Sequence, residues 1–393
     1  MLVLSAARRS LESDLQRAQQ TRGQGRSARL NSAAVRVPYF FSQASRNSSN
    51  ASERGLASNE NPDLSAFMRL FYHPRQGDTD HATVIAKSRR FGDIQSAMSN
   101  THNIESILWD DWHVVAELVA LKHTGRLDTV LLGAPLTVSM DTASGTIKVH
   151  RGEESVAHTE TKYGFVWVCL GVPTRPIVEF SECSEPDRLI ATAGSVAVAV
   201  SGLRAIENFL DLSHLAFVHA GYLGEEPHTE IARYAVDPLP DGGIIATGCK
   251  VYQPKPSPMD SAGFEVDYIY AVRRPYIVVL YKANPVERDR NDMIALLIQP
   301  VSEESCVAHF LTAYPPQGVD SPAVRRFQQF IFGQDRPILE NQVPKRLPLD
   351  PRAEITVRAD GSSAAYRQWL TTVGVRFGAI PAHSAPTQPV AVQ

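Results

Sequence analysis

The sequence predicts an α+β fold in which a small antiparallel β unit precedes a larger antiparallel sheet that packs against one long helix. Short apolar runs separated by Gly, Pro and Asp-containing turns fill residues 106–180. Further strand-like runs lie between Ile244 and Ala313, and a helical stretch of about Pro322 to Glu340 follows them. A sheet curved around one long helix leaves a pocket between the two, so we expect the functional site there.

The first part of the chain differs from the rest in composition. Up to Pro62 it has nine arginines, no lysine and only four acidic residues, with many Ser, Asn and Gln. Such a segment cannot bury enough apolar surface to offset the entropy of ordering it. We expect residues 1–105 to be a disordered or targeting extension, with a transit peptide and a misassigned start as alternatives. The Pro- and Ala-containing stretch 379–393 is expected to be a flexible tail.

Residues 106–180 are expected to form the small β domain. Its apolar runs are bounded by turn residues, as in antiparallel hairpins. These runs are Trp112–Leu121, Val130–Leu132, Leu136–Met140, Thr146–His150 and Tyr163–Leu170.

Residues 181–378 are expected to form the larger domain. It begins with a half-buried strand that contains Val196, Val198 and Val200, followed by a helical stretch from Leu203 to about His219. Apolar and charged residues alternate from Phe264 onward, which indicates a sheet with one solvent-exposed face. The expected strands are Ile244–Tyr252, Phe264–Val272, Ile277–Tyr281, Met293–Gln299 and Cys306–Ala313.

Composition narrows the possible functions. The chain has 43% hydrophobic and 21% charged residues and a net charge of −3, so nothing in its overall charge favours nucleic acid or an anionic membrane. The longest weakly polar run, Leu189–Leu203, is too short and too polar to span a bilayer. The four cysteines are not spaced as CxxC or CxH, which favours a reducing, cytoplasmic location without a disulfide framework.

Two histidines close together after residue 207 could form half of a metal site. Asn208, Asp211 and His214 are spaced i, i+3, i+6, so neighbouring members would share a helix face. His219 follows five residues after His214 and would be within reach if the helix bends or ends there. A 2-His-1-carboxylate site needs one more oxygen ligand from elsewhere in the chain.

Asp335 is the candidate for that ligand. It is the only charged residue on an apolar stripe of the last long helix, and a buried carboxylate there should be protonated or bound to a cation. Pro337 could disturb the helix just beyond it and turn the carboxylate toward the site. The stripe comprises Phe327, Phe330, Ile331, Asp335, Ile338 and Leu339.

Spacing alone leaves other interpretations open. Histidines in an apolar helix are often core residues satisfied by hydrogen bonds, and a D-x2-H-x4-H string also arises by chance. Asp335 could instead be a helix-terminal charge or the partner of Arg336.

Three separated segments resemble the alpha subunits of Rieske-type aromatic ring-hydroxylating oxygenases. Ala205-Ile-Glu-Asn-Phe-Leu-Asp-Leu-Ser-His-Leu-Ala-Phe-Val-His219 is similar to the family's iron motif, and Phe332-Gly-Gln-Asp-Arg-Pro-Ile-Leu-Glu-Asn-Gln342 to its carboxylate segment. Leu347-Pro-Leu-Asp350 and Ala365-Tyr-Arg-Gln-Trp369 resemble its C-terminal signature. The match covers about residues 106–378 and implies a helix-grip, START-like catalytic domain.

The resemblance assigns roles to the candidate residues. It implies that His214, His219 and Asp335 bind a mononuclear Fe(II), that Asp211 orients His214, and that Asn208 lies near the iron.

The sequence departs from the family where the [2Fe–2S] cluster should bind. Only the eleven residues Arg151–Thr161 separate the flanking strands, and none of them is Cys. His150 and His158 are there, but two histidines without thiolates do not hold such a cluster. The first domain is therefore expected to be a degenerate Rieske-like domain without its cluster lobe.

One branch of the family lacks the cluster in the same way and acts on 7-methylxanthine in bacterial caffeine degradation. The resemblance therefore implies O2-dependent N-demethylation of a methylxanthine-like substrate, with electrons from NAD(P)H through a Rieske-bearing partner subunit or reductase. It also implies a trimer or mixed hexamer. An O-demethylase or hydroxylase of a small aromatic acid, and a catalytically silent structural subunit, are the alternatives.

Overall fold

The computed structural model describes residues 104–141, 143–254, 263–284, 287, 289–316, 318 and 320–382. Nearly all of the expected extension and most of the expected tail lie outside these residues. In the described part of the chain, no helix is long and apolar enough to cross a membrane.

The first 75 or so described residues form two small antiparallel sheets, as expected. A three-stranded sheet has the order β1-β7-β6, and a four-stranded sheet has the order β2-β3-β4-β5. The run Trp112–Leu121 was expected to be extended throughout, but helix α6 begins at Leu118 and ends at Thr124, followed by Gly125 in the left-handed region with φ 68°. The elements are α5 (Ser106–Trp109), β1 (His113–Glu117), α6 (Leu118–Thr124), β2 (Arg126–Leu131), β3 (Ala134–Met140), β4 (Ile147–Arg151), β5 (Glu154–Ser155), β6 (His158–Lys162) and β7 (Phe165–Cys169).

The second part is built on a seven-stranded sheet with the order β8-β14-β13-β12-β11-β10-β9, in which all pairs are antiparallel. All five strands predicted between residues 244 and 313 are present. The strands are β8 (Leu189–Val198), β9 (Ala235–Pro238), β10 (Ile244–Gln253), β11 (Phe264–Arg274), β12 (Ile277–Ala283), β13 (Asn291–Ser302) and β14 (Ser305–Tyr314). The described residues also contain two short 3-10 helices, η2 (Ser181–Ser184) and η3 (Arg358–Asp360), and the parallel pair β15 (Leu347–Pro348) and β16 (Ala379–Ile380).

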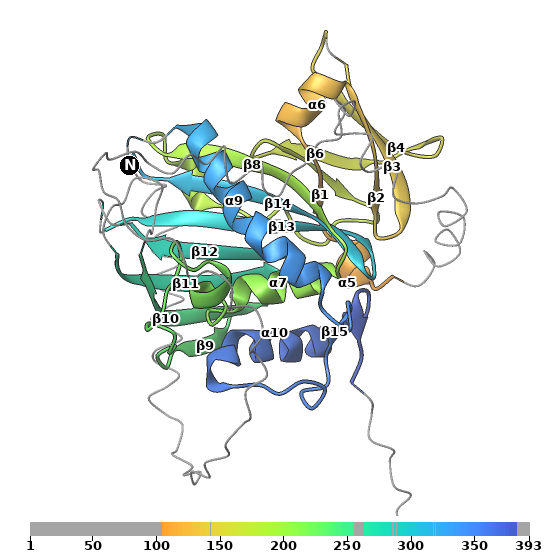
Figure 1. The fold of residues 1–393 in the computed structure, drawn as a ribbon. Coiled ribbons are helices and arrows are strands. Elements are labelled where there is room, and N and C mark those ends of the chain that lie inside the picture. The colour runs from red at the N-terminus through yellow and green to blue at the C-terminus, as the bar shows by residue number, and fades with distance from the viewer. Residues whose placement is uncertain are drawn as a thin grey trace, which may run out of the picture. The chain divides into compact units, whose positions relative to one another are not determined.

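The large sheet is covered on both faces over its central strands. On one face, Val279, Met293 and Leu297 pack with Trp112 and Trp167 of the small β unit. On the other face lie helices α7 (Gly202–Leu210) and α9 (Ser321–Glu340), which Figure 1 shows crossing the sheet. The alternation expected for β11 therefore holds only at its start, where Glu265 and Asp267 are exposed. Strands covered on both sides are buried along nearly their whole length, as β12 is from Ile277 to Lys282 and β13 from Asp292 to Pro300.

The helix expected from Leu203 to about His219 is broken. Helix α7 ends at Leu210, and α8 (Leu215–Val218) is a single turn. Asp211 follows α7 in an extended conformation with ψ 124°, and its Oδ1 accepts the backbone N–H of Ser213 at 2.8 Å. Aspartate competes for backbone donors in this way and so favours turns over helix interiors. The i, i+3, i+6 helix face expected for Asn208, Asp211 and His214 does not exist.

Helix α9 has the expected bounds but a different inward face. Ile338 is 48% exposed, so it does not belong to the buried stripe predicted for it. The helix continues through Pro337 to Glu340, so this proline does not end it. The buried residues of α9 are Val324, Gln328, Phe332, Asp335 and Leu339. Helix α10 (Gly361–Thr372), not predicted, packs against α7 and the β9–β10 edge.

Candidate metal centre

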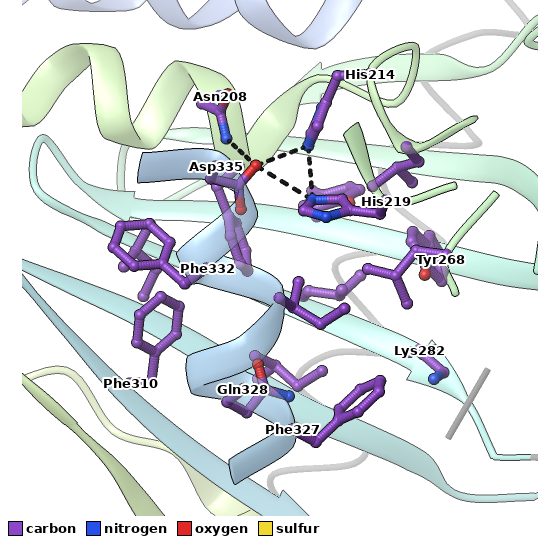
Figure 2. Close-up of a pocket in the computed structure, with 18 of the residues that line it drawn as sticks. Asn208, His214, His219, Tyr268, Lys282, Phe310, Phe327, Gln328, Phe332 and Asp335 are labelled. Carbon is purple, nitrogen blue, oxygen red and sulfur yellow. Dashed lines mark hydrogen bonds and ion pairs between the residues drawn. The ribbon is translucent and has the colours of Figure 1, made fainter. Parts of the chain in front are cut away.

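Three side chains from two segments of the chain converge on one point. His214 Nε2 lies 3.2 Å from His219 Nε2, and Asp335 Oδ1 lies 3.3 Å and 3.1 Å from these two nitrogens. Figure 2 shows the three groups facing one another, with Asn208 beside Asp335. Among the described residues, this is the only group of three His, Cys, Asp or Glu side chains that could hold a metal ion. The structure thus brings together the three residues singled out as ligands.

The break after α7 produces the convergence. His214 is the residue before α8, and His219 is the residue after it, so one helical turn separates the two imidazoles. Asp335 comes from the inward face of α9, where it is only 6% exposed. A continuous helix would place residues five apart on different faces, so the turn at Asp211 is what lets both histidines face Asp335.

The spacing of the atoms fits a metal ion. Two ligand atoms at right angles, each about 2.1 Å from a metal, lie about 3 Å apart. All three separations are close to this value, as expected for three ligands on one face of a metal. Two ligands on opposite sides of the metal would lie farther apart. The donor set of two imidazoles and one carboxylate with open positions is that of non-haem Fe(II) oxygenases.

Each of the three groups is held by another polar side chain. His219 Nδ1 donates to Gln334 Oε1 at 2.9 Å, and His214 Nδ1 faces Asp211 Oδ2 at 3.4 Å. The contact with Gln334 Oε1 requires a proton on His219 Nδ1, and the Nε2 atoms of both imidazoles face the common point. Ligating histidines usually make such a contact through the nitrogen that does not bind the metal.

Asn208 completes this outer set. Its Nδ2 donates to Asp335 Oδ1 at 3.1 Å, the same carboxylate oxygen that faces the two histidines. The alternative partner considered for Asp335, Arg336, binds Glu340 instead at 3.0 Å. Gln334 was not among the candidate residues, because it precedes Asp335 in the helix and consecutive helical residues do not share a face.

The local electrostatics favour a cation at this point. Burial alone would raise the pKa of Asp335, but the contacts with His214 and His219 hold that pKa well below its usual range. Burial likewise lowers the pKa of His214, yet the carboxylates of Asp211 and Asp335 raise it to about 9. Two carboxylates therefore stabilise one positive charge at this point, which a metal ion could supply in place of a proton.

The three groups form one end of a pocket between α9 and the sheet. Its walls are mainly aromatic and aliphatic, with a few polar groups, as in small-molecule sites. The lining residues away from the metal end include Phe209, Tyr270, Leu280, Ile294, Phe310 and Phe332, with Tyr268, Lys282, Tyr314 and Gln328 as the polar members.

The cysteines offer no second metal site in the described residues. Cys169, Cys249 and Cys306 are buried and Cys183 is partly buried, and no two form a disulfide. Cys306-Val-Ala-His309 has the spacing of a Cys-x-x-His pair, but it lies within β14. Residues three apart on a strand point to opposite faces, so this pair cannot share a metal.

Comparisons with known proteins relate the chain to demethylases. Residues 198–375 match the model of the vanillate O-demethylase oxygenase C-terminal domain. The chain is 41% identical over 280 residues to a probable methylxanthine N7-demethylase, NdmC, of Pseudomonas sp. (strain TJI-51), covering 70% of this chain and 98% of that protein. It is 27% identical over 220 residues to the methylxanthine N1-demethylase NdmA of Pseudomonas putida, covering 54% of this chain and 58% of that protein.

The fold also has solved counterparts. The structure of NdmA from Pseudomonas putida CBB5 superposes with a TM-score of 0.54 at 19% identity, covering 68% of this chain and 90% of that one. At this identity the likeness concerns the fold.

Proposed function

The chain belongs to the Rieske-type aromatic ring-hydroxylating oxygenase alpha-subunit family, in the branch of the methylxanthine N-demethylases, and on this premise we propose that it removes an N-methyl group from a methylxanthine-like substrate by oxidation. The observation that carries the proposal is the convergence of His214, His219 and Asp335 at one end of an apolar pocket. A substrate in that pocket would lie directly against the ligand set.

In this proposal, His214, His219 and Asp335 hold a mononuclear Fe(II). When bound there, the metal supplies the activation of O2 that the amino acids cannot perform themselves. The protein residues orient both partners: Gln334 and Asp211 fix the imidazoles, and the aromatic walls of the pocket hold a flat ring and exclude water.

The overall reaction balances with two electrons from outside. The N-methyl compound, O2, two electrons and two protons give the N-hydroxymethyl compound and water. The C–N bond of this hemiaminal then breaks, which leaves the N–H compound and formaldehyde. We propose that the electrons come from NAD(P)H through the [2Fe–2S] cluster of a partner protein, because the described residues offer no second metal site.

The same pocket could take a small aromatic acid, as a substrate of O-demethylation or hydroxylation. The matching domain model is named for a vanillate O-demethylase, so this alternative is tested alongside the first.

The test has a metal arm and an activity arm. Purified protein should contain close to one iron per chain and no acid-labile sulfide. With a Rieske protein and an NAD(P)H-dependent reductase supplied, it should release formaldehyde from 7-methylxanthine in a 1:1 ratio to the demethylated product. Iron without turnover of any methylxanthine or methoxybenzoate would contradict the proposed enzyme. The broad visible bands of a [2Fe–2S] centre would contradict the dependence on a partner cluster.

A further inference from the structure

The pocket has a second polar end, opposite the candidate metal ligands. Figure 2 shows Lys282 and Gln328 at the far side of the pocket from His214, His219 and Asp335. Lys282 is only 5% exposed and Gln328 only 7%, yet both line the cavity. A buried ammonium is costly in a mainly apolar cavity, so Lys282 marks this end of the pocket as a polar one.

Lys282 belongs to a row of polar residues that crosses the sheet. Tyr268 of β11 and Asp292 of β13 are its partners in the two neighbouring ladders, so the three side chains lie on the pocket face of adjacent strands. Directly paired residues have Cβ atoms about 5 Å apart. One step closer to the metal end the same face carries Leu280 and Ile294, which are apolar. The polar row is thus confined to one end of the pocket.

The ammonium can serve the protein and a ligand at the same time. A lysine has three N–H donors, so a contact within the protein leaves others for a ligand. Asp292, its neighbour on β13, accepts from Asn284 Nδ2 through Oδ1 at 2.7 Å. Gln328 Nε2 donates to the Tyr314 hydroxyl at 3.0 Å, and its Oε1 remains an acceptor on the pocket side.

Helix α9 contributes one residue to each end of the pocket and so defines the distance between the two ends. Gln328 and Asp335 are both buried on its inward face and are seven residues apart. Seven residues are two turns, or roughly 10 Å along the helix axis. This spacing suits one fused two-ring heterocycle with its long axis between the polar row and the metal ligands.

We propose that Lys282 donates to the ring carbonyl oxygen farthest from the methyl group that is removed, while Gln328 Oε1 accepts from a ring N–H beside that oxygen, and that these two contacts decide which N-methyl group faces the metal ligands. The inference rests on the proposed function and deepens it. In a methylxanthine, the 2-oxo group and N7 lie at opposite ends of the fused rings, whereas N1 and N3 flank the 2-oxo group. A molecule held by its 2-oxo oxygen presents the N7-methyl group to His214 and His219 and keeps N1 and N3 at the polar end.

The test measures binding without turnover, using the full chain with its iron, without O2 and without the electron-supplying partner. Calorimetric titration compares 7-methylxanthine with 7-methylhypoxanthine, which lacks the 2-oxo group. The wild type should bind the first at least tenfold more tightly. Lys282→Met should weaken 7-methylxanthine binding by about 10- to 100-fold and leave 7-methylhypoxanthine nearly unchanged, because hydrogen bonds to charged groups are the strong ones.

The matched control is Lys250→Met. Lys250 lies on β10 of the same sheet, but it is exposed and paired with Glu265 at 2.8 Å. This variant should bind like the wild type. Gln328→Met changes the second polar group from another element with little change in volume, so it keeps the test valid if Lys282→Met does not fold. It should weaken 7-methylxanthine binding by about 2- to 10-fold.

Turnover provides a second measurement, the product ratio, which would not change if Lys282 had only a structural role. With 3,7-dimethylxanthine and the supplied partner, the wild type should yield mainly 3-methylxanthine, and Lys282→Met should yield a larger share of 7-methylxanthine. An unchanged ligand preference and product ratio in a folded Lys282→Met protein would overturn the proposal.

A third ligand separates the two substrate classes. If the wild type binds vanillate instead of either purine, and this binding depends on Lys282, the lysine is an anchor for a carboxylate, which supports its role and overturns the proposed methylxanthine substrate. Binding of none of the three ligands to the wild type would overturn both.

Discussion

At the scale of single residues, the site depends on side chains that do not themselves point at the metal position. Asp211, Gln334 and Asn208 each contact a different one of the three candidate ligands. They come from the turn after α7, from α9 and from α7 itself. Each therefore fixes a ligand relative to a different element, and the removal of any one should loosen a single ligand while leaving the other two in place.

Gln334 gives the clearest test of this arrangement. Gln334→Met keeps the length of the side chain but removes the acceptor for His219 Nδ1–H. We expect the protein to fold normally and to bind Fe(II) about 10- to 100-fold more weakly, the usual effect of losing such a contact. Iron retained during dialysis against graded chelator concentrations measures this.

Gln329→Met is the control for that variant. Gln329 lies on the same helix but donates to the Ala193 carbonyl oxygen at 3.0 Å, away from the site. Equal iron affinity in both variants and the wild type would show that Gln334 does not support His219.

Asp211 differs from Gln334 because it is charged, and its side chain is 29% exposed. Asp211→Asn keeps the shape and loses the charge beside His214. If the carboxylate serves the supply of electrons from the partner, the variant should keep its iron, lose turnover with partner and NAD(P)H, and still form product with hydrogen peroxide. Failure in both assays would place its role in building the iron site, and normal turnover in both would remove it from the mechanism. Asp128→Asn, in an exposed ion pair with Arg126, is the control.

At the scale of elements, α7 is fixed on the side that faces away from the pocket. Arg204 and Glu207 of α7 form a ring of ion pairs with Arg367 of α10 and Glu354. Arg204 donates to Glu207 at 3.0 Å and to Glu354 at 2.6 Å, and Arg367 contacts both carboxylates. Because Asn208 and the turn at Asp211 continue from α7, this ring helps to set the position of the metal ligands.

Glu354 makes the ring sensitive to pH. Burial alone would raise the pKa of Glu354, but Arg204 and Arg367 lower it to about 2. The carboxyl group therefore takes up a proton more readily in the unfolded chain, where its pKa is near 4.5, than in the folded one. Its contribution to the free energy of unfolding is fully present above about pH 5 and is lost as the pH falls toward 2.

Glu354→Gln should consequently be less stable than the wild type at pH 7, and the difference should shrink between pH 5 and pH 3. Urea unfolding at several pH values measures this. Glu153→Gln, at an exposed turn position, should show no such difference. A gap between wild type and Glu354→Gln that stays constant with pH would mean that Glu354 acts through packing alone.

The elements also show how far the sequence could predict the fold. Strands β10 to β14 and helix α9 were predicted nearly to their bounds, because long periodic or apolar runs depend on burial that composition reveals. The break at Asp211 was missed because it depends on one side chain capturing the N–H of Ser213. The exposure of Ile338 was missed because the inward face of α9 is set by what it packs against, which no single helix encodes.

In the site, too, the features that a local sequence pattern reveals could be predicted, and those that depend on tertiary packing could not. His214, His219 and Asp335 could be chosen from spacing, from an anomalous charge on an apolar stripe and from resemblance to a family. Gln334 and Lys282 could not, because a glutamine beside a ligand and a lysine near a strand end are ordinary in sequence. Their significance comes from the register of β11, β12 and β13 and from the rotation of α9, which are tertiary properties.

At the scale of the whole molecule, the described residues account for the core and for the site. Buried apolar residues extend from Leu108 to Ala379 in two clusters, one on each face of the large sheet. The small β unit contributes Trp112, Phe165 and Trp167 to the second cluster. This unit covers a face of the sheet that would otherwise expose large apolar side chains, so we expect the large sheet to depend on it for stability.

This division of the chain leads to a prediction about residues 1–100. Among the described residues, the core clusters run from Leu108 to Ala379 and the metal ligands lie within that range. The first 62 residues are rich in Arg, Ser, Asn and Gln and poor in apolar periodicity, so they offer little surface for packing on that core. A chain that begins at residue 101 should thus unfold at nearly the same temperature as the full chain, bind one iron and bind 7-methylxanthine with the same Kd. Calorimetry and metal analysis of the two proteins side by side measure these quantities. A matched truncation that starts at residue 119 removes β1 and with it Val114 and Val115 from the two clusters, and should abolish cooperative unfolding. If the chain from residue 101 also loses stability cooperatively, part of the N-terminal hundred residues packs on the core, and the boundary near residue 105 is wrong.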